Sequence, residues 1–355
     1  MKEICIAVTG INATDNPGPG CGIIRSLRYN PDFRGRIIGL AYDAMDPGNF
    51  LSDHVNASYI IPYPSQGIEV LLSAIKEIHR NDPIDVLIPS LDAELLNFIK
   101  IQSELSRMGI RTFLPGEEGF KMRSKNVLAE FCKSNGITVP STHCIYSIED
   151  IYHLNMNYPL YIKGLFYDAY LVHSYTEASN AFGILCARWG LPLLAQEYIP
   201  GEEFDIVALG DGRGETIGAV PMKKMSLTEK KKAWAGITIE NPVLIEMTKK
   251  IVKSLCWRGP LEVEIIANLE SQKYYLIEIN PRFPAWCFLA PGAGQNLPEA
   301  LVRMALEEDI LPFEGYQVGK LFVRYSCEVL ADLKDIEQLL IQGKLINQAP
   351  KGKTS

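Results

Sequence analysis

Two neighbouring segments in the last third of the chain carry regularly spaced acidic side chains. Residues 261–266 read Leu-Glu-Val-Glu-Ile-Ile, and residues 274–280 read Tyr-Tyr-Leu-Ile-Glu-Ile-Asn. Polar and apolar residues alternate in both, as they do in strands that have one polar face. The polar residues 268–273 lie between the two segments. We therefore predict an antiparallel hairpin whose polar face carries carboxylate and amide oxygens.

The register of this hairpin decides which polar groups meet. If the turn centres on Ser271, Glu264 lies opposite Glu278, and Glu262 lies opposite Asn280. Three carboxylates and one amide would then crowd one face, where like charges repel unless a cation neutralises them. Oxygen ligands without histidine or thiolate are those that Mg²⁺ prefers. The hairpin thus predicts a magnesium site, with a solvated polar sheet face as the alternative.

The residues that follow the second strand extend this pattern. Pro281 stops the strand, and Arg282 adds a guanidinium that could bind a phosphate through two hydrogen bonds. Glu278-Ile-Asn-Pro-Arg282, preceded by Glu264, resembles the metal-binding signature of the ATP-grasp superfamily. The most similar branch contains the carbamoyl-phosphate synthetase large chain and biotin carboxylase. The resemblance implies that Glu264, Glu278 and Asn280 hold Mg²⁺ or Mn²⁺ on the phosphates of ATP.

The resemblance continues upstream in residues 194–205, which are similar to the hinge between the two lobes of that family. It implies that the backbone of Glu197, Tyr198 and Ile199 faces the adenine, and that Glu203 accepts the ribose hydroxyls. Taken without the resemblance, the same residues predict a strand, a Pro-Gly turn and a second strand.

Two lysines complete the resemblance. Lys163 stands where the family has a strand lysine on the ATP phosphates, and with Arg282 it would act on the transferred phosphate. Lys125, near the start of a helix expected over residues 124–135, corresponds to an earlier lysine of the family. Backbone donors and the helix dipole would add to its charge there. The segment after Lys163 departs from the family, because Gly164 is its single glycine where a glycine- and serine-rich flap is usual.

Strand and helix patterns set out the architecture around these residues. Alternation up to residue 115 predicts a parallel sheet with helices on both faces, and the remainder predicts an α+β region with an antiparallel sheet. The expected fold class is therefore α/β and α+β, with a Rossmann-like domain followed by a two-lobed ATP-grasp fold. The expected domains are residues 1–115 (Rossmann-like), 116–199 (first lobe), 200–315 (second lobe with the metal site) and 316–355 (C-terminal extension and flexible tail).

Local periodicity and end signals predict the individual elements. The expected strands are residues 4–9, 36–42, 85–89, 112–115, 160–163, 193–199, 203–209, 216–222, 261–267 and 274–279. The expected helices are residues 68–80, 92–108, 124–135, 176–189, 242–255, 297–308 and 333–340. The glycine-rich residues 18–22 lack the full dinucleotide-binding spacing and predict only a strand-to-helix turn.

The composition of the chain argues against several classes of function. The formal net charge of −7 argues against general binding to nucleic acid or anionic membranes. The eight cysteines are scattered singly, which predicts reduced thiols and a cytoplasmic location. No apolar stretch is long enough to span a bilayer, and the first ten residues predict a strand rather than a signal peptide.

Together these features predict an ATP-dependent ligase that joins a carboxylate to an amine through an acyl-phosphate and releases ADP and phosphate. The expected partners are small-molecule carboxylates and amines, amino acids among them. A homodimer is compatible with the sequence. The aromatic run 283–288 could lie near the acceptor, but we interpret it as core. Two alternatives stay open: a non-catalytic ATP-binding sensor or subunit, which the unusual segment after Lys163 favours, and a dehydrogenase that uses residues 18–22.

Overall fold

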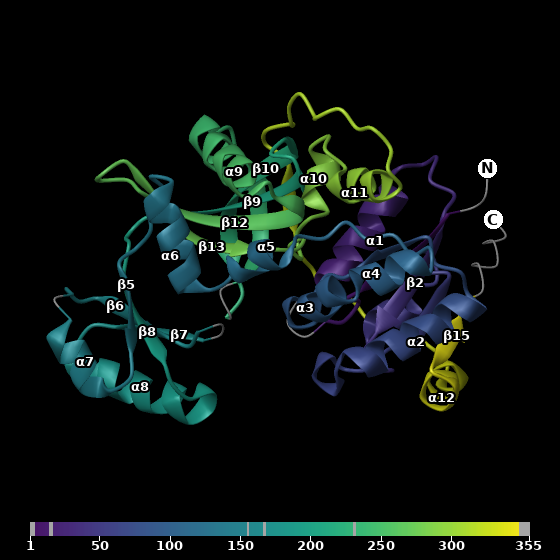
Figure 1. Ribbon diagram of the computed structural model, residues 1–355, viewed down its shortest axis with the longest axis horizontal. Coiled ribbons are helices and arrows are strands. Elements are labelled where there is room, and N and C mark those ends of the chain that lie inside the picture. The colour runs from purple at the N-terminus through teal and green to yellow at the C-terminus, as the bar shows by residue number, and fades with distance from the viewer. Residues whose placement is uncertain (1–3, 14–16, 155, 166–167, 230–231, 348–355) are drawn as a thin grey trace. The chain divides into compact units, whose positions relative to one another are not determined.

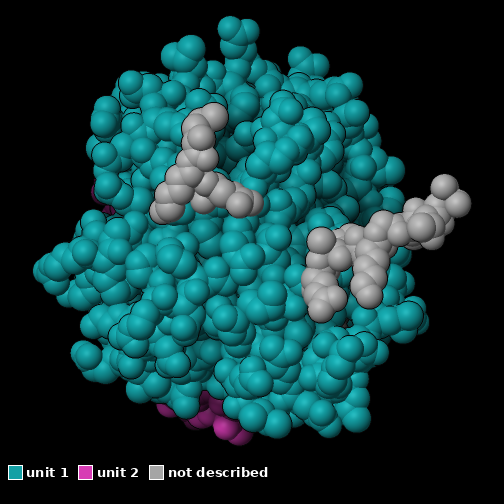
Figure 2. Space-filling view, turned by 90° about the vertical axis from the view of Figure 1, so that its right-hand side faces the viewer, with its two compact units in different colours: residues 1–119, 206–262, 280–355 teal, residues 120–205, 263–279 magenta. Residues whose placement is uncertain are grey.

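The computed structural model describes residues 4–13, 17–154, 156–165, 168–229 and 232–347. The chain forms two compact units (Figure 2). Unit 1 contains residues 1–119, 206–262 and 280–355, and unit 2 contains residues 120–205 and 263–279. The fold is mixed α/β, with one mainly parallel sheet and two further sheets, as expected (Figure 1).

The parallel sheet of unit 1 has the strand order β15-β3-β2-β1-β4. Strands β1 to β4 are parallel where they pair, and β15 is antiparallel to β3. All five residues of β1 are buried, as is usual for strands that are covered on both faces. The strands are β1 (Cys5–Thr9), β2 (Arg36–Ala41), β3 (Ala57–Ile60), β4 (Val86–Ile88) and β15 (Lys344–Ile346).

The helices near this sheet correct two predictions. The helix expected over 92–108 is two helices, because Ile101 leaves helical geometry with φ −96° and ψ 7°. The strand expected over 112–115 does not form, and Arg111 instead makes an isolated bridge to Val86. The sequence patterns missed α1, β3 and β15. The helices are α1 (Pro19–Tyr29), α2 (Ile68–Asn81), α3 (Asp92–Lys100), α4 (Gln102–Arg107) and α5 (Glu117–Lys121), with 3-10 turns at Pro47–Phe50 and Pro64–Gln66.

The glycine-rich segment connects β1 to α1, as expected for a strand-to-helix turn. Helix α1 begins at Pro19, with Gly18 as its N-cap. A Cβ at Gly20 would lie 2.0 Å from the carbonyl oxygen of Thr9. Close packing of the helix start on the end of β1 therefore accounts for this glycine.

The second sheet has the order β13-β12-β9-β10-β11-β14 and contains the predicted hairpin. The turn occupies residues 269–272, and the Asn268 side chain accepts the backbone N–H groups of Glu270 and Ser271 at 3.0 and 2.9 Å. The strands are β9 (Glu202–Asp211), β10 (Thr216–Leu227), β11 (Ala233–Thr238), β12 (Arg258–Asn268), β13 (Lys273–Asn280) and β14 (Leu321–Val323). Helices α9 (Pro242–Leu255), α10 (Leu289–Gly292) and α11 (Leu297–Ala305) accompany them in the chain.

Unit 2 contains an antiparallel sheet with the order β5-β8-β6-β7. Its apolar residues pack with those of two helices into one core that includes Ile162, Leu185 and Leu193. The strands are β5 (Thr142–Ile145), β6 (Leu160–Lys163), β7 (Ala169–Val172) and β8 (Leu193–Glu197), and the helices are α6 (Lys125–Ser134), α7 (Ile148–His153) and α8 (Tyr175–Trp189). Ser124 is the N-cap of α6, as predicted.

The last forty residues contribute strands to two sheets of the fold. Strand β14 pairs with β11, and β15 pairs with β3 after the predicted helix, α12 (Leu333–Gln342). The predicted flexible tail, residues 350–355, lies outside the described residues. In the part of the chain that the structure describes, no helix has the length and apolarity needed to cross a membrane.

Candidate active site

The first group of predicted site residues lies on the sheet of unit 2. Strands β6 and β8 pair with Tyr161 opposite Gln196, so Lys163 and Gln196 share one face. The Lys163 ammonium donates to Gln196 Oε1 at 2.5 Å, and Gln196 Nε2 donates to Thr142 Oγ1 at 2.9 Å. The ammonium also lies 4.7 Å from the ring centre of Tyr161. A cation is thus held on this face by an amide and an aromatic ring.

The second lysine joins the start of α6 to the hairpin. Lys125 Nζ lies 3.2 Å from Glu278 Oε2 and donates to the carbonyl oxygen of Ile277 at 3.1 Å. Only 11% of the Lys125 side chain is exposed, against 31% of Glu278. The structure therefore brings two predicted site residues together, although it pairs them as an internal ion pair.

A shallow pocket in unit 2 opens beside these groups. Its lining combines apolar residues with three polar side chains. Its lining residues are Leu128, Ala129, Val139, Pro140, Leu276 and Ile277 together with Lys125, Thr142 and Gln196. Such a lining suits a ligand with a flat apolar body and polar groups at its rim.

The predicted hinge residues follow this pocket along the chain. Strand β8, the Pro200–Gly201 turn and β9 succeed one another as the sequence predicts. The Glu197 backbone N–H donates to the Ser141 carbonyl oxygen at 2.8 Å, and its carboxylate accepts the Ser141 N–H at 3.0 Å. Ile199 is buried, and Glu203 is exposed on β9. The end of β8 is thus fixed to the chain that enters β5.

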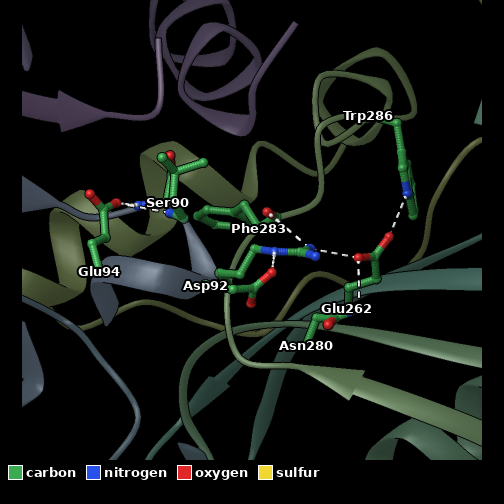
Figure 3. A network of polar contacts seen from close by, with 9 residues as sticks. Ser90, Asp92, Glu94, Glu262, Asn280, Phe283 and Trp286 are labelled. Atoms are coloured by element: carbon green, nitrogen blue, oxygen red, sulfur yellow. Dashed lines mark hydrogen bonds and ion pairs between the residues drawn. The ribbon is translucent and has the colours of Figure 1, made fainter. Parts of the chain in front are cut away.

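Two further predicted residues, Asn280 and Arg282, lie in unit 1 beside a buried carboxylate, whereas Glu264 belongs to unit 2 (Figure 3). Glu262, 6% exposed, accepts hydrogen bonds from Arg282 Nη1 at 2.6 Å and from Trp286 Nε1 at 2.9 Å. It also accepts Asn280 Nδ2 at 3.3 Å, and this contact agrees with the pairing expected for the hairpin. The same guanidinium also donates from Arg282 Nε to Asp92 Oδ2 at 3.3 Å. Two carboxylates therefore flank the one guanidinium.

This pairing corrects the expectation that three carboxylates crowd one face of the hairpin. Among the described residues, no three His, Cys, Asp or Glu side chains are grouped so that they could hold a metal ion. The physical reason is that two of the acids have cationic partners of their own. Glu262 pairs with Arg282, and Glu278 pairs with Lys125. Ion pairs within each unit thus relieve the like-charge repulsion that we attributed to the hairpin.

The turn that carries Asp92 is held by a second buried acid, Glu94 (Figure 3). One oxygen of Glu94 accepts the backbone N–H groups of Ser90 at 2.8 Å and Leu91 at 2.9 Å. The hydroxyls of Thr9 and Tyr42 also donate to this carboxylate. Burial raises the pKa of Glu94, while these hydrogen bonds lower it. The network fixes the chain between β4 and α3.

Comparison with known proteins follows from this fold and geometry. Residues 191–321 match the family model described as ATP-grasp in the biosynthetic pathway with Ter operon. Many solved structures share the fold. An L-amino acid ligase from Bacillus licheniformis has a TM-score of 0.65 at 15% identity, over 86% of this chain and 75% of that one. This part of the chain therefore matches an ATP-grasp family model, and the chain as a whole shares the fold of the ligase.

Two further structures have the same fold. The biotin carboxylase domain dimer of Hydrogenobacter thermophilus 2-oxoglutarate carboxylase, solved with MgADP, ADP and bicarbonate, gives a TM-score of 0.66 at 16% identity, over 89% of this chain and 74% of that one. N5-carboxyaminoimidazole ribonucleotide synthetase from Thermotoga maritima gives 0.63 at 16% identity, over 88% and 78%. No curated protein matches the chain by sequence.

Hydrogen bonds of Asp168 connect the unusual segment after Lys163 to helix α8. The Gly164 N–H donates to the Asp168 carbonyl oxygen at 3.1 Å, and Asp168 adopts a positive φ of 60°. The Asp168 carboxylate accepts Arg188 Nη1 at 2.8 Å and Trp189 Nε1 at 2.9 Å. Residues 166–167 of the predicted flap lie outside the described residues.

Sequence reasoning missed three side chains that contact predicted site residues. Asp92 lies shortly after the end of the buried strand β4. An acid at the carboxyl end of a parallel strand is a signal for a ligand site and could have been used to predict it. Gln196 could have been found only from the register of β6 and β8. Trp286 belongs to the aromatic run that we interpreted as core, and it is indeed buried, with its indole N–H directed to Glu262.

Proposed function

We propose that this chain is an ATP-grasp enzyme, an ATP-dependent ligase that joins a carboxylate to an amine. The observation that carries the proposal is the arrangement in unit 2, where an apolar pocket with Lys125 at its edge adjoins the Lys163–Gln196–Thr142 chain. Apolar walls are the kind of surface that an adenine contacts, and two ammonium groups suit a polyphosphate. In this proposal the backbone of residues 197–199 binds the adenine edge.

The proposal gives each remaining predicted residue a role. Glu203 would accept the ribose hydroxyls, and Lys125 and Lys163 would bind phosphate oxygens. Because Lys125 pairs with Glu278, and Lys163 with Gln196, both ammonium groups are already oriented by side chains before ATP binds. Preorganised charge of this kind lowers the reorganisation needed when the nucleotide arrives.

The oxygen ligands for a divalent cation fit the same proposal. Glu264, Glu278 and Asn280 offer hard oxygens from two adjacent strands, β12 and β13, as Mg²⁺ or Mn²⁺ requires. The Asn280 nitrogen donates to Glu262, so its amide oxygen is the atom that would bind an ion. When bound, the cation would neutralise charge on the phosphate oxygens.

The reaction that these residues would support has two steps. A substrate carboxylate oxygen bonds to the γ-phosphorus of ATP as the bond from phosphorus to ADP breaks. The amine nitrogen then bonds to the carbonyl carbon, phosphate leaves, and the nitrogen loses a proton. Lys163 and Arg282 would offset the charge on the transferring oxygens in the first step. One structure of the same fold is an L-amino acid ligase, and this similarity favours an amine as the acceptor.

Replacing Lys163 with Met tests the nucleotide site. The variant should bind ATP roughly 10- to 100-fold more weakly, because hydrogen bonds from a charged group to phosphate are lost. Adenosine, which has no phosphate, should bind wild type and variant equally. Isothermal titration calorimetry with both ligands measures this difference. Equal losses for ATP and adenosine would contradict a phosphate-binding role.

The ligase activity itself is tested by ADP release from ATP and Mg²⁺ over a panel of paired carboxylates and amines. We expect ADP release that requires both members of a pair, together with a product of their combined mass less water. ATP binding without ADP release for any pair would favour the non-catalytic sensor instead.

A further inference from the structure

The sheet that contains the β12–β13 hairpin ends at its other edge in strand β14. The one strand that pairs with β14 among the described residues is β11, and the two are antiparallel. The Arg324 N–H donates to the Trp234 carbonyl oxygen at 2.9 Å, and the Thr238 N–H donates to the Lys320 carbonyl oxygen at 2.8 Å. The backbone groups of the even-numbered residues of β14 therefore point toward β11.

The odd-numbered residues present their backbone groups to the outer edge of the sheet, because these groups alternate in direction along an antiparallel strand. Their side chains are apolar and exposed: Leu321 is 56% exposed, Val323 61% and Tyr325 78%. Between them, Phe322 packs against the core of unit 1. Edge strands usually carry a charge, a proline or a bulge that prevents pairing. The three outward residues offer no such protection, so this edge is open to another strand.

The chain stays extended beyond β14. Residues 324–332 contain no turn, bend or helix, and residues 325–328 are all exposed. Within the part of the chain that the structure describes, residues 325–331 make no backbone–backbone hydrogen bond. Backbone groups of this kind are satisfied by water or by a neighbouring strand. A strand over residues 321–329 can therefore form here when a partner strand is added.

This segment is complementary to a second copy of itself. We consider an antiparallel pair of two copies with a two-fold axis at Tyr325. Tyr325 then lies opposite its own copy, and Val323 lies opposite Cys327. Leu321 lies opposite Val329. All of these residues are odd-numbered, so the outward backbone groups of the two strands meet, and their side chains form cross-strand pairs on one face.

The charges of the segment favour this register. Glu328 lies opposite Phe322 of the second copy, and Lys320 and Arg324 of that copy occupy the two diagonal positions. Opposite charges on neighbouring strands stabilise a sheet. With the axis at Val323 instead, only Lys320 would lie diagonal to Glu328. The segment thus carries its own charge complement, and this favours another copy of the chain over an unrelated strand.

We propose that the chain forms a homodimer by strand addition, in which residues 321–329 of two copies pair antiparallel about a two-fold axis at Tyr325. The six-stranded sheet of one copy then continues into that of the other. Two-fold pairing covers the open edge and stops at two chains, because each copy uses the same surface. The interface belongs to unit 1 and does not depend on the proposed ligase function.

Light scattering after size-exclusion chromatography of the full chain, over a wide range of concentrations, tests the dimer. We expect twice the mass of one chain at high concentration. Tyr325→Lys places two ammonium groups opposite each other and should raise the dissociation constant roughly 10- to 100-fold. The control Leu311→Lys adds the same charge at an 88% exposed apolar residue outside the segment and should leave the dissociation constant unchanged. Circular dichroism checks that both variants are folded.

Val323→Cys tests the register directly. Position 323 lies opposite Cys327 of the second copy, at a separation that a disulfide spans. Residues four apart on one extended strand are about 13 Å apart, so a bridge within one chain is excluded. Mild oxidation of Val323→Cys should therefore give a covalent dimer on a non-reducing gel. Adding Cys327→Ser should abolish it, and wild type should give none.

Three results would overturn the proposal. The first is the mass of a single chain at every concentration. The second is a dimer that Tyr325→Lys does not weaken and Val323→Cys does not cross-link, because its interface would lie elsewhere. The third is a cross-link that survives Cys327→Ser, because the axis would then lie at another residue. None of these results bears on ATP binding or ADP release, so the ligase function is tested separately.

Discussion

Replacing Glu278 with Gln should lower ADP-forming turnover by roughly 100- to 1000-fold while the protein stays folded. The amide keeps the shape of the side chain but removes the negative charge that faces Lys125 at 3.2 Å and that would bind a divalent cation. Lys125 keeps its hydrogen bond to the Ile277 carbonyl oxygen, and the amide oxygen of Gln can still accept from its ammonium, so the loss of stability should be smaller than on removal of the whole side chain. A coupled assay for ADP and a thermal melt measure the two effects.

The matched control for this variant is Glu270→Gln. Glu270 lies exposed in the turn of the same hairpin, so its replacement tests the general effect of removing one acid there. It should change neither turnover nor melting temperature. If Glu278→Gln retained full turnover, the assignment of Glu278 to the reaction would be wrong.

The largest effect on stability is expected from Glu262→Ala, which should lower the free energy of unfolding by about 3 kcal/mol. The substitution leaves the Arg282 guanidinium, 15% exposed, without its buried partner. It also removes the acceptor of the indole N–H of Trp286. Urea denaturation followed by tryptophan fluorescence and circular dichroism measures the loss. A change below about 0.5 kcal/mol, typical of surface sites, would contradict this.

A double variant separates the structural role of this pair from its chemical role. With Glu262→Met and Arg282→Met together, no buried charge is left without a partner, and such replacements of buried ion pairs are often neutral for stability. We therefore expect the double variant to be more stable than Glu262→Ala. It should still be inactive, because the guanidinium proposed to offset the charge on the transferring phosphate oxygens is absent. Recovery of activity along with stability would show that Arg282 has only a structural role.

Much of the candidate site could be predicted because local patterns report it. Alternation of polar and apolar residues is a property of single strands, so the hairpin of β12 and β13 was predicted with nearly its observed bounds. The N-cap signal at Ser124, where α6 begins, was equally local. Strand β15 was not predicted, because it is three residues long and exists through its pairing with β3, almost three hundred residues earlier.

The partners of the hairpin acids could not all be predicted from local patterns, because one comes from a distant part of the chain. From the sequence, Glu262, Glu264 and Glu278 are three like charges on one hairpin, and a shared cation is the simplest way to neutralise them. The fold instead supplies Arg282 to the first and Lys125 to the last. Lys125 is 153 positions away from Glu278, and no local rule could have paired them.

Residue types at short spacings are enough to indicate the resemblance to the ATP-grasp signature, the lysine at the end of the strand at 163 and the mixed α/β class. Which charges meet depends instead on contacts between segments that are far apart in the chain. The ion pair of Asp92 with Arg282 joins residues 190 positions apart. Its formation depends on the packing of the β4–α3 turn beside the end of β13 within unit 1, and that packing is a property of the whole folded chain rather than of any one segment.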